Sequence, residues 1–132
     1  MSIDIINHIE FPVEDAGRSR IFYEAALAPL GLSLVMSVDP DVARRLGARH
    51  GFGESNYPRL WIQEKGGAMM PIHVAFTAAD REAVDRFHTA ALAAGGVDNG
   101  KPGIRGHYHA NYYAAYILDP DGHNIEAVCQ TG

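Results

Sequence analysis

A repeat of 65 positions relates the first half of the sequence to the second. In the 25 positions from 8 to 32, nine residues are identical to the residue that lies 65 positions later. Typical residue frequencies predict about two such identities by chance. A repeat of this length constrains the fold, because each half must form a similar unit. The identical pairs are His8 and His73, Phe11 and Phe76, Asp15 and Asp80, Phe22 and Phe87, Ala25 and Ala90, Ala26 and Ala91, Leu27 and Leu92, Ala28 and Ala93, and Gly31 and Gly96.

Both halves show a similar predicted order of elements. In the first half, β-branched residues over 3–11 predict a strand that ends at Pro12, and Asp15 is placed to cap the helix that follows. The remaining elements of that half are a helix ended by Pro29 and Gly31, a strand from Leu32, an open segment over 39–53 and a strand over 57–64. The second half predicts a strand over 69–77, a helix capped by Asp80, a Gly- and His-rich loop over 99–111, and strands over 112–118 and 124–128.

This order predicts an α+β fold of two βαβββ modules related by a pseudo-twofold axis. We expect curved, mixed and mostly antiparallel sheets around a cleft. The first module covers about residues 1–66 and the second about residues 67–132, and the whole chain of 132 residues forms one domain. A chain of this length buries roughly two-thirds of its unfolded surface, which is enough for a shared core.

The charge and the cysteine content exclude several classes of partner. The formal net charge is −5 and neither Lys nor Arg forms a run, which argues against nucleic acids and anionic membranes as partners. No segment has the ~20 apolar residues of a membrane span, and the N-terminus lacks a signal-peptide pattern. One cysteine, Cys129, rules out a disulfide within the chain and fits a reducing compartment. We therefore expect a cytoplasmic protein that acts on a small molecule.

Glu126 is the most informative polar residue, because it lies in the apolar strand from Ile125 to Cys129. A carboxylate is rarely buried without a partner. The 65-residue shift places Glu126 on Trp61, so that His8, Trp61, His73 and Glu126 occupy four equivalent places. Side chains from the first and last strands of both modules meet if the strands curl around one cleft.

Two histidines and a carboxylate on rigid strands suit Fe(II), Mn(II) or a related divalent ion. An isolated histidine in a strand is more often a structural residue than a ligand. The pairing of His8 with His73 and the position of Glu126 favour a metal site over that alternative. The sequence therefore predicts His8, His73 and Glu126 as metal ligands, with the metal being Fe, Mn, Ni or Zn.

Several segments resemble the vicinal-oxygen-chelate superfamily, which contains the glyoxalase, bleomycin-resistance and dioxygenase-like proteins. They are "NHIEF", "RSRIFYEAALAPLGL", "IHVAF" and "YILDPDGHNIEAV". The resemblance covers nearly the whole chain, and its most specific part is the hairpin from Asp119 to Glu126. It implies a cup-shaped sheet around a divalent metal held by His8, His73 and Glu126. It also implies a homodimer, in which the cleft is completed either within one chain or by the partner chain.

Three departures from individual branches of the superfamily narrow the expected activity. Glyoxalase I enzymes resemble this chain but carry a fourth polar ligand where Trp61 falls, and Trp61 cannot bind a metal. The fosfomycin-resistance thiol transferases rely on a basic tail after the last ligand, and nothing basic follows Glu126. Extradiol dioxygenases usually have two such domains. The substrate and the reaction subclass therefore stay open.

The loop "GIRGHYHANYY" supplies further candidate site residues. Glycines beside imidazoles and phenols are typical of mobile segments that close over substrates. We predict His107 and His109, together with Glu126, as catalytic acid–base groups. The predicted substrate contacts are Trp61, Arg105, Tyr108 and Tyr113.

Three functional hypotheses follow from these residues. The first is a metal-dependent enzyme of the glyoxalase-like type that stabilises an enolate or oxyanion of a small oxygenated substrate. The second is a metal-free protein that sequesters a small molecule, as bleomycin-resistance proteins do, and Trp61 favours it because indole stacks on planar ligands. The third is a structural module without chemistry. The set of two histidines and one glutamate favours the first.

Overall fold

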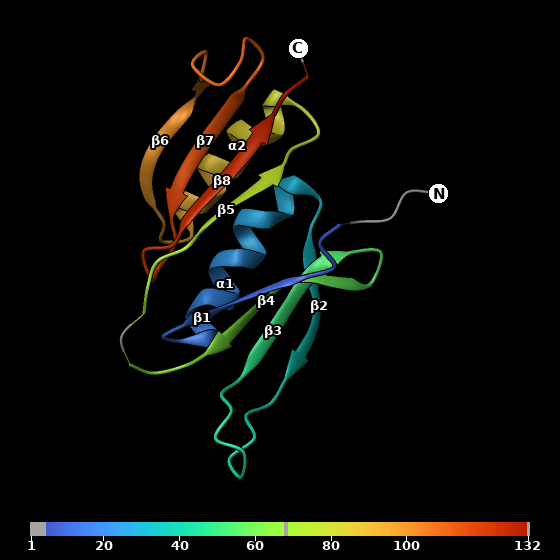
Figure 1. Ribbon diagram of the computed structural model, residues 1–132, viewed down its shortest axis with the longest axis vertical. Helices are drawn as coiled ribbons and strands as arrows, with labels where there is room; N and C mark the ends of the chain where they lie inside the picture. Colours follow the sequence, from blue (N-terminus) through green and yellow to red (C-terminus); the bar gives the residue numbers. More distant parts are fainter. Residues whose placement is uncertain (1–4, 68, 132) are drawn as a thin grey trace.

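The computed structural model describes residues 5–67 and 69–131 and contains two copies of one arrangement (Figure 1). Each copy is a strand, a helix and three further strands, as the repeat predicts. The first comprises β1 (Ile9–Val13), α1 (Ala16–Leu27) with a short 3-10 turn η1 (Ala28–Leu30), β2 (Ser33–Val38), β3 (Arg49–Glu54) and β4 (Tyr57–Glu64). The second comprises β5 (His73–Thr77), α2 (Arg81–Ala93), β6 (Val97–Ile104), β7 (Tyr113–Leu118) and β8 (Asn124–Cys129).

Each module forms a four-stranded mixed sheet in which the first strand pairs in parallel with the last. The orders are β1-β4-β3-β2 and β5-β8-β7-β6. Ile9 pairs with Leu60, and Val74 pairs with Ile125, so the interval is 51 residues in both modules. Because the two registers agree at every pair, the 65-residue repeat of the sequence is also a repeat of the structure. The predicted α+β fold of two βαβββ modules is confirmed.

The helices form where the capping residues and the apolar spacing predict them. The side chain of Asp15 accepts a hydrogen bond from the backbone N–H of Arg18, and that of Asp80 accepts one from Ala83. Such side-chain caps satisfy N–H groups that have no partner within the helix. Both helices lie behind the sheets in Figure 1 and contact each other. Their buried faces form one core with the apolar faces of the strands, which includes Phe22, Tyr23, Leu27, Phe52, Phe87, Ile117 and Ile125.

Two strand boundaries differ from the predicted ones. The first strand covers Ile9–Val13 and includes Pro12. A proline is tolerated there because β1 is an edge strand, whose unpaired side needs no N–H donor. The start of the predicted strand, at Ile3 and Asp4, lies outside the described residues. The segment over 99–111 is a loop only in part, since its first half belongs to the edge strand β6.

Glycines and a proline hid β6 in the sequence. The strand pairs with β7 through two register shifts, one between Asp98 and Gly100 and one between Gly100 and Gly103. Irregular pairing of this kind is common at the edge of a sheet. The segment over 39–53, for which the sequence predicted no defined element, contains a turn and a strand. Residues 41–46 form the turn, which a bridge between Asp41 and Leu46 closes, and β3 follows it.

The turn between β7 and β8 joins the two modules. Asp119 is buried, and its Oδ2 accepts a hydrogen bond of 2.5 Å from the hydroxyl of Tyr23 on α1. His123 is 0% exposed, accepts a bond at Nδ1 from the backbone N–H of Ile72, and donates from Nε2 to the carbonyl of Pro12. Both ring nitrogens of His123 are therefore used within the chain, which makes this residue a structural bridge between the modules.

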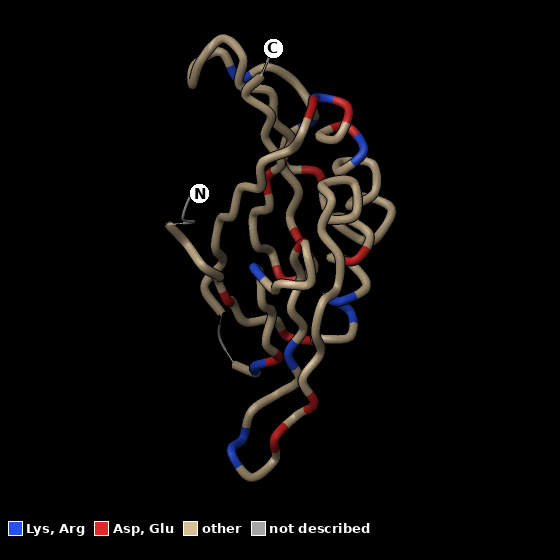
Figure 2. Tube along the Cα trace, turned by 90° about the vertical axis from the view of Figure 1, so that its right-hand side faces the viewer, with Lys and Arg blue, Asp and Glu red and all other residues tan. Residues whose placement is uncertain are grey.

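Charged residues are interspersed along the trace rather than gathered on one side (Figure 2). The Lys and Arg residues of the described ranges therefore gather into no broad basic surface, and the net charge of the chain is negative. No helix in the described ranges combines the length and the apolar character needed to cross a membrane.

Replacing Tyr23 by Phe should destabilise the protein by about 1–3 kcal/mol, because the buried Oδ2 of Asp119 loses its donor. The free energy of unfolding in urea measures this effect. Tyr57→Phe is the control, because Tyr57 is exposed and its hydroxyl bonds to exposed Asn7. We expect the control to change stability by about 0.5 kcal/mol or less. Equal losses of unfolding free energy in the two variants would contradict a stabilising role of the Tyr23–Asp119 hydrogen bond between the modules.

Candidate metal centre

The centre of the second module is an imidazole–carboxylate pair on neighbouring strands. His73 begins β5, and Glu126 lies in the middle of β8, which pairs in parallel with β5. The Nε2 atom of His73 lies 2.9 Å from Oε1 of Glu126. The side chain of Glu126 is 2% exposed, whereas that of His73 is 51% exposed. The buried carboxylate therefore has a partner that faces solvent, so the pair is reachable from outside.

Two tyrosines complete the surroundings of Glu126. The hydroxyl of Tyr112 donates a hydrogen bond of 2.5 Å to Oε2 of Glu126. Tyr116 lies directly opposite Glu126 in the β7–β8 register, and its ring is 6.2 Å from that of His73. Burial, together with the charge of Glu126, raises the pKa of Tyr116 to about 12, and burial and the bond to Glu126 raise the pKa of Tyr112 as well. Both phenols are therefore protonated donors at neutral pH.

His8 lies just before β1 in the first module, and a hydrogen bond orients its imidazole. Its Nδ1 atom lies 2.7 Å from Oδ1 of Asn7. The same amide oxygen accepts a hydrogen bond from Tyr57, and the backbone carbonyl of Asn7 accepts one from Arg59. Because Nδ1 donates to Asn7, the Nε2 atom of His8 keeps its lone pair for another partner.

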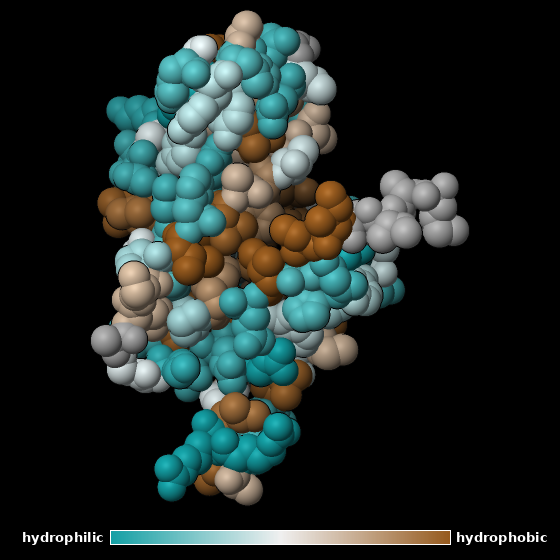
Figure 3. Space-filling model, viewed as in Figure 1, coloured by the Kyte–Doolittle hydropathy of each residue, from teal (hydrophilic) through white to brown (hydrophobic). Residues whose placement is uncertain are grey.

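His8 and His73 line one apolar groove between the facing edges β1 and β5. The groove has a volume of about 530 Å³. Figure 3 shows its hydrophobic surface in the middle of the face, between the two sheets. Its apolar lining includes Ile9, Leu30, Leu32, Phe52, Leu60 and Phe76. Over residues 5–67 and 69–131, no three His, Cys, Asp or Glu side chains gather closely enough to hold a metal ion. One chain thus brings together His73 and Glu126 but does not add His8 to them.

Trp61 occupies the place in the first module that Glu126 occupies in the second. Trp61 pairs with Glu10 and Gly51, as Glu126 pairs with Ala75 and Tyr116. A Cβ atom on Gly51 would lie 3.1 Å from the indole, so the glycine makes room for the ring. Trp61 is only 8% exposed.

Arg49 was not singled out by the sequence, yet it covers the indole of Trp61. Its guanidinium lies 4.5 Å from the ring centre, and its Nη2 atom donates a hydrogen bond of 2.7 Å to Glu10. One face of the indole is therefore already occupied by a side chain of the protein. The sequence alone does not reveal that Arg49 covers Trp61, because the two residues lie on different strands. Their contact can be inferred only when the pairing register of β3 with β4 is known.

The loop after β6 holds four predicted site residues with different degrees of freedom. Arg105 donates to the carbonyls of Gly103 and Lys101, so its guanidinium supports the loop. His109 accepts a bond from the N–H of Asn111, and its Nε2 donates to Gln130. Tyr108 is 60% exposed and stacks on Tyr112, and the exposed ring of His107 lies 4.2 Å from that of Tyr108. Arg105 is half-buried, whereas His107, Tyr108 and His109 are exposed to solvent.

The predicted substrate contact Tyr113 lies on the opposite side of the sheet from Glu126. Its hydroxyl donates to Asp85 of α2, and the guanidinium of Arg81 lies 5.1 Å from its ring centre. Successive side chains of a strand point to opposite faces, so Tyr112 and Tyr116 lie on the side of Glu126 while Tyr113 faces the helix. The alternation was visible in the sequence, but the face was not.

One protein-family model matches most of this chain. The model of the Glyoxalase/Bleomycin resistance protein/Dioxygenase superfamily matches residues 5–127. The chain belongs to this superfamily. The resemblance inferred from the hairpin over 119–126 is therefore confirmed. No match was found among curated protein sequences.

Solved structures of the superfamily share the fold. A glyoxalase/bleomycin resistance protein from Albidiferax ferrireducens T118 is 27% identical, with a TM-score of 0.78 over 97% of this chain and 100% of that one. A glyoxalase I mutant from Zea mays is 24% identical, with a TM-score of 0.71 over 93% of this chain and 46% of that one. The fosfomycin resistance protein FosX from Listeria monocytogenes, complexed with Mn(II) and 1S,2S-dihydroxypropylphosphonic acid, is 19% identical, with a TM-score of 0.69 over 96% and 93%. The last two likenesses concern the fold alone.

The donor atoms in this superfamily member fit a divalent ion. Imidazole nitrogen and carboxylate oxygen bind such ions at about 2.0–2.2 Å, so two neighbouring ligands of an octahedral ion lie roughly 3 Å apart. The observed separation between His73 and Glu126 is 2.9 Å. The free Nε2 of His8 is a further nitrogen donor of the same kind. The residues present are therefore compatible with a divalent metal ion. Binding the ion would displace the proton that His73 and Glu126 share, because metal ligands bind in their deprotonated forms.

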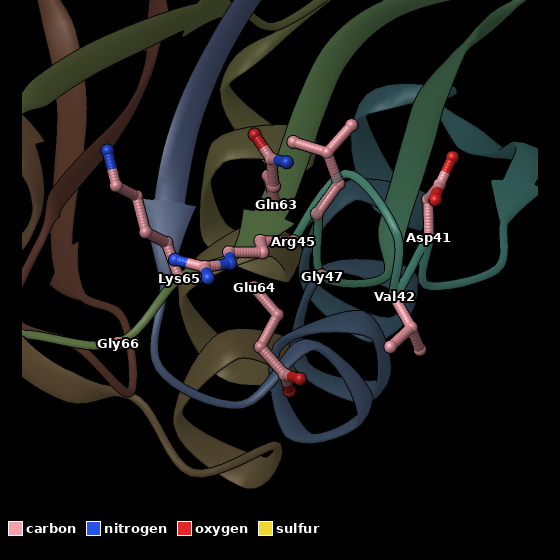
Figure 4. Close-up of a pocket in the computed structure, with 9 residues that line it drawn as sticks. Asp41, Val42, Arg45, Gly47, Gln63, Glu64, Lys65 and Gly66 are labelled. Atoms are coloured by element: carbon pink, nitrogen blue, oxygen red, sulfur yellow. The ribbon is translucent and has the colours of Figure 1, made fainter.

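A second hollow, of about 550 Å³, lies between the turn over 41–47 and the end of β4 (Figure 4). Arg45, Gln63 and Lys65 surround it, and Glu64 turns away from them. The carboxylate of Glu64 accepts a hydrogen bond from the backbone N–H of Ala16 at the start of α1. None of the predicted site residues lines this hollow.

Replacing Arg49 by Ala should expose Trp61 and cost about 1 kcal/mol of stability, because the cation above the indole is removed. Trp61 is the one tryptophan of the chain, so its fluorescence reports the change directly. We expect a red-shifted emission and stronger quenching by acrylamide. Arg86→Ala, which removes a surface ion pair with Glu82, is the control. Identical quenching in both variants would contradict the position of Arg49.

Proposed function

We propose that this protein is a divalent-metal-dependent enzyme of the glyoxalase/dioxygenase type that acts on a small oxygenated substrate. The proposed ligands are His8, His73 and Glu126. The contact between His73 and the buried Glu126 carries the proposal, because the two donors already have the spacing of neighbouring metal ligands. Burial of Glu126 among apolar strand residues gives a second argument, since a partner of positive charge offsets the cost of placing a carboxylate there.

The bound ion would supply Lewis-acid stabilisation of negative charge that develops on a substrate oxygen. The chain's own residues have separate roles in the proposal. Tyr116 borders the carboxylate, and Tyr108 with His107 forms the solvent-facing wall of the loop. His107 is the proposed acid–base group, because it is exposed beside Tyr108 and imidazole is the side chain that most often serves as a general acid or base. Arg105 and His109 serve as supports of the loop, because their polar atoms bond within the chain.

We further propose that the complete site forms in a homodimer, between His8 of one chain and the His73–Glu126 pair of a second copy. Within the described residues of one chain His8 joins no three-residue cluster. His8 is exposed at the edge of the first module, next to the exposed apolar side chains of Ile5 and Ile6. Apolar side chains at a sheet edge are a typical part of a protein interface. A twofold dimer also creates two identical sites.

The apolar groove favours a second candidate function, metal-free sequestration of a small molecule. Its volume of about 530 Å³ is in the range of small-molecule pockets, and apolar side chains dominate its lining. In that case His8 and His73 would serve as polar contacts at its rim.

We also infer a cytoplasmic location, because the one cysteine, Cys129, is free and buried.

Metal content separates the two candidate functions. We expect the untagged protein to contain about one divalent ion per chain after incubation with Mn, Fe, Ni and Zn salts. Glu126→Ala and His73→Ala should lose it, because each removes a ligand. His107→Ala should retain it, since the loop histidine is no ligand, and so provides the control. Elemental analysis of the dialysed proteins measures the content. A wild type that stays empty with all four metals would end the metal-dependent proposal and leave sequestration.

Mixed dimers test where the site forms. His8→Ala and Glu126→Ala chains with different tags are expressed together, and the heterodimer is purified through both tags. If each site uses two chains, one of its two sites keeps every ligand, and the heterodimer should bind about one ion. Each variant alone should bind none. A heterodimer without metal would place the site within one chain.

A further inference from the structure

The two oxygens of Glu126 have different partners. Oε1 lies 2.9 Å from Nε2 of His73, and Oε2 accepts a 2.5 Å hydrogen bond from the hydroxyl of Tyr112. Tyr112 lies just before β7, at the end of the loop, and is half-buried. The phenol therefore reaches the carboxylate from the side away from His73 and leaves Oε1 as the oxygen next to the histidine.

Tyr112 also connects Glu126 to the loop. Its ring centre lies 4.7 Å from that of Tyr108 and 5.7 Å from that of His109. His109 is in turn bonded to Gln130, just after β8. The hydroxyl of Tyr112 is thus held in place by ring contacts on two sides, so its direction toward Glu126 does not depend on the hydrogen bond alone.

The first module provides a comparison within the same molecule. The 65-residue shift places Tyr112 on Gly47 and Tyr116 on Gly51, and it places Glu126 on Trp61. The module that lacks the carboxylate therefore also lacks both phenols. The two phenols therefore occur together with the carboxylate. The βαβββ fold does not require them, because the first module forms the same sheet without them.

We propose that Tyr112 is a positioning residue that holds Glu126 as a one-oxygen metal ligand, with Oε2 engaged by the phenol and Oε1 directed to the ion. This inference rests on the proposed metal function. Nε2 of His73 and Oε1 of Glu126 would hold the ion, and the hydrogen bond from Tyr112 to Oε2 would persist. Hydrogen-bond partners of metal ligands typically change metal affinity about 10- to 100-fold when they are removed.

The test compares Tyr112→Phe with Tyr113→Phe, using Mn²⁺ and Co²⁺ alone as probes. Both variants lose one phenol hydroxyl and keep the ring, but Tyr113 bonds to Asp85 on the helix side of the sheet. Calorimetry gives the affinity for Mn²⁺. The visible absorption of bound Co²⁺ reports the coordination number, which rises when the freed carboxylate binds through both oxygens.

We expect Tyr112→Phe to bind Mn²⁺ at least about tenfold more weakly and to change the Co²⁺ spectrum, while Tyr113→Phe matches the wild type. Equal affinities and spectra in the two variants would overturn the assignment and leave the proposed function standing. A weaker affinity with an unchanged Co²⁺ spectrum would also overturn it, because the carboxylate would then not be repositioned. A wild type that binds neither ion would overturn the proposed function and this assignment together.

Discussion

The parallel pairing of the first and last strands in each module determines where every candidate ligand lies. Ile9 pairs with Leu60 and Val74 with Ile125, so a side chain on the first strand meets one 51 residues later. Backbone hydrogen bonds along these ladders hold the strands at a fixed spacing of about 4.8 Å. His73 pairs with Asn124 and Glu126 pairs with Ala75, so the side chains of His73 and Glu126 meet diagonally across the two neighbouring strands. The ladder fixes the backbone positions of both residues, so their side chains can change their relative position only by changing rotamer.

The two modules use the same backbone for different chemistry. In the second, Glu126 is surrounded by His73, Tyr112 and Tyr116. In the first, the indole of Trp61 fills the equivalent space, and the pair of Arg49 and Glu10 covers it. Gly51, in place of Tyr116, makes room for the indole, whereas Gly47, in place of Tyr112, lies against Glu64. The chain has thus kept polar donors on one side of its pseudo-twofold axis and closed the other side with packing.

The turn between β7 and β8 explains how these modules stay in register with each other. Asp119 and His123 contribute buried hydrogen bonds to α1, to the end of β1 and to the segment before β5. Buried polar groups cost free energy unless each has a partner, so such a network favours one arrangement over its alternatives. The hairpin that makes the superfamily recognisable in sequence is therefore also the part that positions Glu126.

Much of the fold followed from local signals, and the exceptions have physical causes. Asp15 and Asp80 marked the helix starts, and the repeat paired Trp61 with Glu126 correctly, because both signals depend only on residues close in sequence or on a constant shift. The strand β6 was missed because Gly100, Pro102 and Gly103 interrupt it, and an edge strand tolerates them. The sequence predicts a substrate contact at Tyr113, yet Tyr112 is the tyrosine that contacts Glu126, because alternation separates the two faces of a strand without showing which face meets the core.

The sequence by itself determined the two βαβββ modules, the capped helices and the positions of His73 and Glu126 on the first and last strands of the second module. Only the tertiary structure decided which partners each side chain has. It placed Tyr112 on Oε2 of Glu126, Arg49 on Trp61, and the two ring nitrogens of His109 on Asn111 and Gln130. The reason is that these contacts join residues from different strands and loops, whose approach depends on the twist and edge of each sheet and not on spacing along the chain.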